Sequence, residues 1–188
     1  AYPHLRTSAS LHIETERLVL RQWRPDDVDA LLQIYAHPEV ARWLGPATQD
    51  DVTTSIERYE HAWDVLGFGR WAVDDRASRR LVGRVGVMRQ PSWGGSAVKD
   101  EIGWVVERAR WGEGLATEAA RAAVADVFAR VGLPAVVSFA LPENVASRRV
   151  MEHCGMRERG VALWAGRDHV WYSLGVDDWR RRSEQRVD

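Results

Sequence analysis

Residues 101–118 read EIGWVVERARWGEGLATE, and this stretch passes from a β-rich run through a glycine-rich turn into a long helical pattern. Gly112 and Gly114 let the backbone adopt positive φ and approach a ligand closely. The unpaired N–H groups in the first turn of the following helix point at whatever binds there, and the helix dipole favours negative charge. The stretch therefore predicts an anion site, and a pyrophosphate is its natural occupant.

The same turn argues against two well-known phosphate-binding motifs. It contains no Gly-Lys-Ser/Thr, so a nucleoside-triphosphate P-loop is not indicated. It also lacks the GxGxxG spacing of a dinucleotide fold, because Gly114-Leu115-Ala116 is followed by Thr117. The turn therefore favours a phosphate-bearing cofactor other than a nucleoside triphosphate or a dinucleotide.

The flanking sequence predicts a single sheet with helices. The expected elements before the turn are a strand over 12–23, helices from Pro25 to about Pro38 and over 50–66, and a hairpin over 70–75 and 81–88. A loop over 90–97 leads to the strand 101–106. After the turn we expect a helix from 113 to 131, a strand over 135–141, a helix over 143–154, and strands over 156–164 and 169–174. This order indicates an α+β or mixed α/β fold.

The length of 188 residues suits one domain. We predict that residues 11–180 form it and that residues 1–10 and 181–188 are flexible ends. The net charge of −1 indicates no nucleic-acid or membrane partner. Cys154 is the only cysteine, which excludes an intrachain disulfide and a cysteine-based zinc site. We predict no metal site, and a soluble, cytoplasmic protein without a spanning helix.

Three motifs resemble one family. The turn Trp111–Ala116 is similar to the pyrophosphate loop of the GNAT superfamily of acetyl-CoA-dependent N-acetyltransferases. The stretch 144–156 resembles that family's later asparagine helix. The opening Thr15–Arg21, together with the form WGEGLATEA, resembles the ribosomal-protein alanine acetyltransferase (RimJ/RimL-like) branch. The resemblance implies a mostly antiparallel twisted sheet in which the strand 102–106 splays from its parallel neighbour 135–141, with pantetheine in the gap.

The resemblance also implies where acetyl-CoA (coenzyme A) binds. The backbone near Val105 and Val106 would pair with the pantetheine amides. Asn144 either contacts the pantetheine or only caps its helix. The remaining implied contacts are Trp111, Gly112, Glu113, Gly114, Leu115, Ala116, Thr117, Ser147 and Arg149.

Two positions depart from the family pattern. Trp111 stands where Gln or Arg is usual, and Glu113 stands where a cation is common. The Glu113 carboxylate opposes the phosphates. Arginines nearby either compensate for it or are solvated surface charges; they are Arg108, Arg110, Arg148 and Arg149.

The chemistry of amide formation suggests roles for a few side chains. The attacking amine must lose its proton, and Glu101 is the candidate general base; alternatively it is an exposed carboxylate at a strand end. His153 and His169 are weaker candidates. Ser147 would protonate the leaving thiolate, or is an ordinary helix serine, and a backbone N–H of Val105 or Val106 would meet the developing oxyanion.

The leading hypothesis is thus an N-acetyltransferase that moves an acetyl group to a primary amine by direct attack. The acceptor is either a protein N-terminus or a small amine, and a homodimer stays open. Acceptor contacts are expected from tryptophans in the first helices and final hairpin, namely Trp43, Trp63, Trp164 and Trp171. The alternatives are a non-catalytic acyl-CoA sensor and, more remotely, a nucleotide-binding protein.

Overall fold

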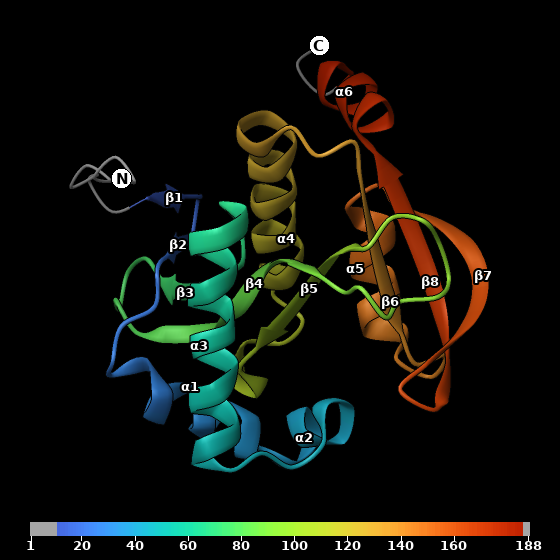
Figure 1. The fold of residues 1–188 in the computed structure, drawn as a ribbon. Coiled ribbons are helices and arrows are strands. Elements are labelled where there is room, and N and C mark those ends of the chain that lie inside the picture. Colours follow the sequence, from blue (N-terminus) through green and yellow to red (C-terminus); the bar gives the residue numbers. More distant parts are fainter. Residues whose placement is uncertain (1–10, 186–188) are drawn as a thin grey trace, which may run out of the picture.

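A computed structural model describes residues 11–185, in which one eight-stranded sheet has the order β1-β2-β3-β4-β5-β6-β8-β7 (Figure 1). All neighbouring strands are antiparallel except the pair β5 and β6. The mixed sheet with a single parallel pair confirms the predicted fold class. The strands are β1 His12–Glu14, β2 Leu18–Arg21, β3 Arg70–Asp75, β4 Leu81–Arg89, β5 Asp100–Val106, β6 Ala135–Ala140, β7 Arg157–Trp164 and β8 Arg167–Gly175.

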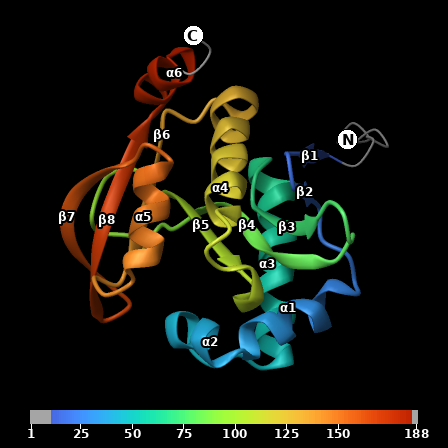
Figure 2. The same cartoon turned by 180° about the vertical axis from the view of Figure 1, so that it is seen from behind.

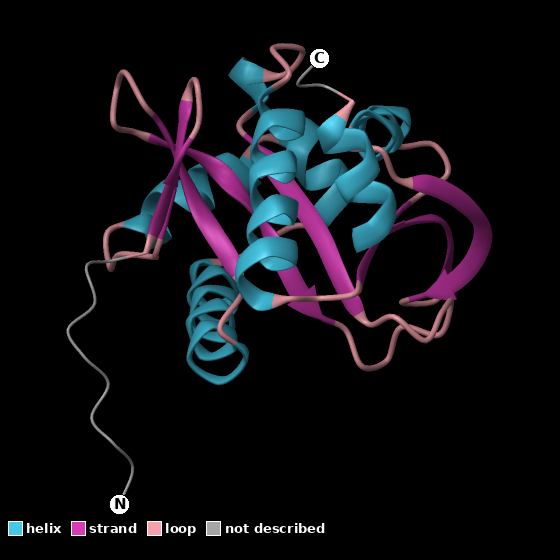
Figure 3. Ribbon diagram, turned by 90° about the horizontal axis from the view of Figure 1, so that it is seen from above, coloured by secondary structure: helices cyan, strands magenta, loops and turns pink. Residues whose placement is uncertain are grey.

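Helices cover both faces of this sheet. Figures 1 and 2 show α3 on one face and α4 and α5 on the other, and the view from above shows the sheet between the two helical layers (Figure 3). A 3₁₀ turn over Arg108–Arg110 precedes α4, and a π-helical turn over Val127–Val131 ends it. The α-helices are α1 Asp27–Ala36, α2 Pro38–Leu44, α3 Gln49–Leu66, α4 Leu115–Asp126, α5 Val145–His153 and α6 Val176–Glu184.

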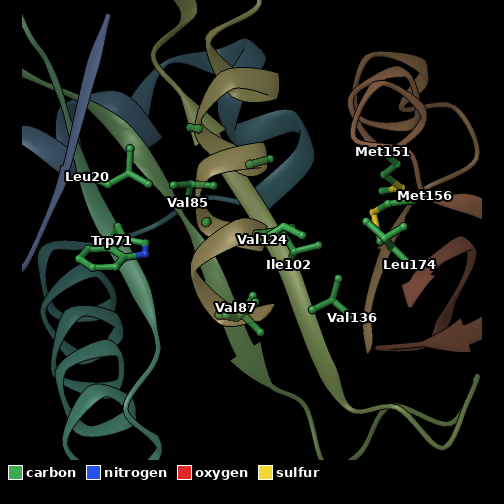
Figure 4. Packing of buried hydrophobic residues seen from close by; sticks show 14 of the residues in the cluster. Leu20, Trp71, Val85, Val87, Ile102, Val124, Val136, Met151, Met156 and Leu174 are labelled. Carbon is green, nitrogen blue, oxygen red and sulfur yellow. The ribbon is translucent and has the colours of Figure 1, made fainter. Parts of the chain in front are cut away.

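The apolar core forms on each side of the sheet from alternating strand residues. Val85 and Val87 of β4 pack with α4, whereas Met88 belongs to the cluster with α1 and α3 on the other face. In Figure 4, Val85, Ile102 and Val124 lie together under α4, and Met151 lies with Met156 and Leu174. The helix α4 is thereby fixed to the centre of the sheet, and its first turn stands at the end of β5.

The parallel pair is barely joined. The only register pair between β5 and β6 is Glu101 with Val137, although each strand continues for several residues beyond it. The two strands therefore splay apart toward Val106, as the resemblance implied.

Three element predictions need correction. The strand predicted over 12–23 is a hairpin of β1 and β2, because the Thr15 hydroxyl accepts the Leu18 N–H and closes a turn. Pro38 opens the additional helix α2 instead of only ending α1. A further helix, α6, follows β8 and continues to Glu184, past the predicted domain end at residue 180. The predicted flexible ends 1–10 and 186–188 lie outside the described residues.

Candidate active site

A cavity of about 660 Å³ opens where β5 and β6 separate. Its outer end is formed by the glycine-rich turn and α5, and its inner end by β3, β4, α2 and the hairpin β7–β8. Of the predicted site residues, the lining includes Glu101, Val105, Val106, Trp111, Gly112, Gly114, Leu115, Ala116, Thr117, Asn144, Ser147 and Arg149.

The glycine-rich turn is built as an anion cradle. Gly112 and Gly114 have φ of 84° and 80°, and a Cβ on Gly112 would meet no atom within 4 Å. Within the described part of the chain, the backbone N–H groups of residues 112–117 donate no hydrogen bond, whereas Glu118 N–H already bonds to Gly114 O. Successive free donors at a helix N-terminus are the arrangement that binds a phosphate.

Trp111 fixes the turn to the sheet. Its indole Nε1 donates to the carbonyl of Val106 at 2.8 Å, and the Arg108 guanidinium lies 5.0 Å from its ring centroid. Arg108 itself pairs with Glu39 of α2. A side chain that departs from the family pattern thus holds the turn against the end of β5.

Glu113 does not face the cavity. Its carboxylate accepts two 2.9 Å hydrogen bonds from Arg110 Nε, and Arg110 in turn binds Asp75 at 3.0 Å. Hydrogen bonds from Ser78 and from Arg110 lower the pKa of Asp75 to about 2. Arg110 therefore compensates the Glu113 charge, as one reading of the sequence anticipated.

The N-terminal hairpin supports the turn from the other side. Glu118 accepts hydrogen bonds from the Thr15 hydroxyl at 2.6 Å and from Arg17 N and Nε at 2.8 Å. Arg17 Nη1 also donates to the carbonyl of Glu113. Burial raises the pKa of Glu118, but these hydrogen bonds outweigh it and the net pKa is lowered. Two of the motifs that carried the family resemblance are thus in direct contact.

The start of α5 contributes the opposite rim. Asn144 Oδ1 caps the helix by accepting Ser147 N–H at 3.1 Å, so its capping role is real. The Ser147 hydroxyl and the exposed Arg149 guanidinium line the cavity and have no partner among residues 11–185. The guanidinium of Arg148, by contrast, has partners within the protein, because it donates hydrogen bonds to Tyr172 and Glu158.

Glu101 lies at the inner end as one half of a buried ion pair. Its Oε2 accepts from Arg70 Nη2, and Arg70 Nη1 donates to the carbonyls of Gly86 and Gly103. A Cβ on Gly103 would lie 2.7 Å from Glu101 Oε1, so glycine is needed to admit the pair. Glu101 is therefore 7% exposed, which corrects the alternative of an exposed carboxylate.

Arg84 is a second cation at this inner end. Its Nε donates to the Tyr35 hydroxyl, and its guanidinium lies 5.8 Å and 5.9 Å from the ring centroids of Tyr35 and Tyr59. Arg84 lies opposite Val105 in the β4–β5 ladder, on the same face as Glu101. Sequence reasoning missed both Arg70 and Arg84, because strand arginines carry no motif.

Aromatic side chains close the inner end. Trp43 of α2 and Trp164 of β7 line the cavity with Phe139 and His169. Behind them, buried Trp93 from the loop 90–99 stacks on Phe139 at 4.3 Å between ring centroids. The other two predicted acceptor contacts lie outside the lining, since Trp63 packs on Trp71 and Trp171 on Trp93.

Several other candidates have defined places. His153 and His169 both line the cavity. Tyr172 is distant from α5 in sequence, yet its hydroxyl bonds to Arg148 and Glu152 of that helix; it is buried outside the lining. Half-buried Cys154 packs against the core beside α4.

Residues 11–185 contain neither a candidate metal site nor a helix that could span a membrane. The described residues contain no cluster of three or more His, Cys, Asp or Glu side chains that could hold a metal ion. In the same part of the chain, no helix combines the length and apolar character needed to cross a bilayer.

Comparison with known proteins adds an independent finding. A family model described as an acetyltransferase (GNAT) domain matches residues 17–157, about three quarters of the chain. The chain is also 26% identical over 152 residues to the uncharacterized N-acetyltransferase YoaA of Bacillus subtilis, covering 79% of this chain and 84% of that protein.

Solved structures share the fold. An acetyltransferase of Agrobacterium tumefaciens superposes with a TM-score of 0.78 and 25% identity, covering 93% of this chain and 99% of that one. A ribosomal-protein-S5-alanine acetyltransferase of Vibrio fischeri gives a TM-score of 0.72, with coverage of 90% and 98%. Its identity is 16%, so this likeness is one of fold alone.

Proposed function

This chain belongs to the GNAT acetyltransferase family and is an N-acetyltransferase, and we propose that it binds acetyl-CoA between β5 and β6 and passes the acetyl group directly to a primary amine. The family prediction made from the sequence is confirmed. The observation that carries the proposal is the row of free N–H groups over 112–117 at the mouth of the splayed strands.

The residues present fit a pyrophosphate followed by a pantetheine. The N–H groups of residues 112–117 would bind the phosphate oxygens, with Arg149 adding a cation at the rim. Glu113 would contribute its backbone only, because Arg110 occupies its carboxylate. No side chain fills the cradle at Gly112.

The strand register selects which backbone groups meet the pantetheine. Ser138 Oγ of β6 donates to the carbonyl of Ile102, so Ile102 faces the gap. Because a strand alternates every residue, Trp104 and Val106 face the same way. The Val105 carbonyl instead approaches β4, lying 2.1 Å from the position of a Cβ on Gly83. We therefore propose the backbone of Trp104 and the N–H of Val106, in place of Val105, as the main contacts, because the Val106 carbonyl already accepts the Trp111 indole N–H.

Acetyl-CoA supplies an acetyl thioester, and the protein has to manage two protons. Glu101 Oε1 has no hydrogen-bond partner among the described residues and lines the cavity, so it would take the proton from the amine directly or through water. As the N–C bond forms and the C–S bond breaks, the Ser147 hydroxyl would donate a hydrogen bond or a proton to the sulfur. The Val106 N–H would meet the developing oxyanion.

Calorimetric titration with acetyl-CoA followed by a free-thiol assay against a panel of amines tests the proposal. We expect saturable binding and thiol release that depends on an amine. Gly114→Ala should weaken binding, whereas Gly132→Ala is the matched control because Gly132 also has positive φ, 79°, but lies outside the cavity lining. Binding without release from any amine would support an acyl-CoA sensor instead, and absence of binding would refute the anion cradle.

A further inference from the structure

The inner end of the cavity holds a cation, Arg84, that forms no ion pair with a carboxylate among residues 11–185. Of the five N–H donors of Arg84, only Nε has a partner within residues 11–185, and that partner is the Tyr35 hydroxyl. Nη1 and Nη2 donate to no described residue, although Arg84 is only half-buried and lines the cavity. A guanidinium held this way has its bidentate edge available.

Neighbouring acidic groups attract Arg84 without pairing with it. Burial lowers the pKa of Arg84, but its acidic neighbours, Glu101 among them, outweigh it and the net pKa is raised. Burial raises the pKa of Tyr59, but the charges of Arg84 and Arg70 outweigh it and the net pKa is lowered. Tyr35 is uncharged near neutral pH, because burial raises its pKa to about 12. Glu101 is the only acidic residue in the cavity lining and is bound to Arg70. The three charged residues of the inner end, Arg70, Arg84 and Glu101, therefore sum to one positive charge.

The acidic groups around this end are committed elsewhere. Asp100, on the same strand as Glu101, binds Arg89 at 2.8 Å. Glu39 of α2 pairs with Arg108, and Glu107 lies 3.8 Å from Arg80. A polycationic acceptor would thus meet net repulsion, whereas an anion would find an unpaired partner.

Between Glu101 and Arg84, the facing ladder positions are both glycines and contribute no side chain of their own. In the β4–β5 ladder, Gly86 faces Gly103 in the step between the pair Met88–Glu101 and the pair Arg84–Val105. The Arg70 guanidinium crosses this step and bonds to both glycine carbonyls. A ligand lying there would reach a carboxylate that can take its proton at one end and a free guanidinium at the other.

Building on the proposed function, we propose that the acceptor is a primary amine that also carries a carboxylate, which Nη1 and Nη2 of Arg84 bind as a fork. The planar guanidinium matches a carboxylate bidentately. The rest of the acceptor would contact the aromatic wall of Trp43, Phe139 and Trp164. A free amino acid satisfies these conditions, whereas a peptide N-terminus lacks the adjacent carboxylate.

The test compares matched acceptors that differ only at the carboxyl group. Acetylation of L-phenylalanine, L-tryptophan, L-methionine and 4-aminobutyrate is measured against the carboxamide of each. For at least one pair we expect the acid to have a kcat/KM roughly ten- to hundredfold higher than the amide, as for loss of a charged hydrogen bond. Arg84→Met should remove this ratio and Arg84→Lys should restore part of it, while Arg180→Met, on the exposed side of α6, keeps it.

Binding without turnover separates this proposal from the proposed function. In the presence of coenzyme A, the N-acetyl acid of a preferred pair should raise the melting temperature more than the N-acetyl amide does, and Arg84→Met should abolish the difference. Amines acetylated with no preference for the acid, or equal shifts from acid and amide, would overturn the carboxylate proposal. Absence of acetylation for every acceptor would refute the proposed function, and the melting shifts would still decide the role of Arg84.

Discussion

Arg21 and Arg84 are both strand arginines that lie against α1, but their surroundings are opposite. All five N–H donors of Arg21 are used, by Asp27, by Asp74 and by the carbonyl of Gln22, at 2.6 to 3.0 Å. Arg84 has one neutral partner and faces a cavity. A guanidinium whose N–H donors are all bonded within the protein holds secondary-structure elements together. A guanidinium with unbonded donors at a cavity is available to a ligand.

The largest expected effect comes from breaking the network of Arg21, Asp27 and Asp74. Arg21→Met would leave Asp27 and Asp74 buried without their cation, which should lower the free energy of unfolding by about 3–5 kcal/mol. Urea denaturation measures this, with Arg180→Met as the surface control. A loss below about 1 kcal/mol would show that the network is not structural.

Arg70 is the intermediate case, because its carboxylate partner also faces the cavity. Glu101→Gln keeps a hydrogen bond to Arg70 but removes the base, so kcat should fall roughly a hundredfold or more while acetyl-CoA still binds. Asp100→Asn, one residue earlier and paired with Arg89, is the matched control and should leave kcat within a few-fold. An unchanged kcat in Glu101→Gln would exclude Glu101 as the base.

The stability of Arg84→Met tests the contrast between Arg84 and Arg21 directly. Because Arg84 has one hydrogen bond to a neutral group, its loss should change the free energy of unfolding by about 1 kcal/mol or less. Urea denaturation beside Arg21→Met gives the contrast directly. A loss as large as that of Arg21→Met would mean that Arg84 is structural and would remove the distinction between the two arginines.

Asp75 and Arg110 form a rim pair for which we expect the smallest effect. The pKa of Asp75 is lowered from 3.8 to about 2, so its contribution to stability is complete above pH 3.8 and is lost as the pH falls toward 2. The stability difference between the wild type and Asp75→Asn should therefore shrink as the pH is lowered from about 5 to about 2.5. A difference that does not depend on pH would show that the Asp75 charge contributes nothing.

The sequence predicted the site best where the chemistry depends on the backbone. The turn 111–117 could be found because glycines at a strand-to-helix junction have few other uses, and its family resemblance is confirmed by the match over residues 17–157. The element order was also predictable from periodicity, except for short segments such as α2, whose seven residues between the caps His37 and Gly45 leave no room for a repeat.

The inner end could be predicted only in part. Glu101, Trp43 and Trp164 were named from the sequence, whereas Arg70 and Arg84 acquire meaning only from the sheet register. Arg70, Arg84 and Glu101 come from three strands, and nothing in their local sequence indicates that they share one face. Trp93, in a segment predicted simply as a loop, proves to be a fully buried support for Phe139. Sequence separation likewise concealed the contact of Tyr172 with α5.

The single ladder pair between β5 and β6 also has a mechanical consequence. The single pair divides the sheet into two parts, β1–β5 and β6–β8. The first part comes from the N-terminal part of the chain and the second from the C-terminal part. Tension applied along the chain would load this junction, where few backbone bonds resist separation, before it loads the well-paired ladders on either side. A ligand bridging β5 and β6 would then stiffen the whole domain, and single-molecule pulling would register its arrival as a higher rupture force.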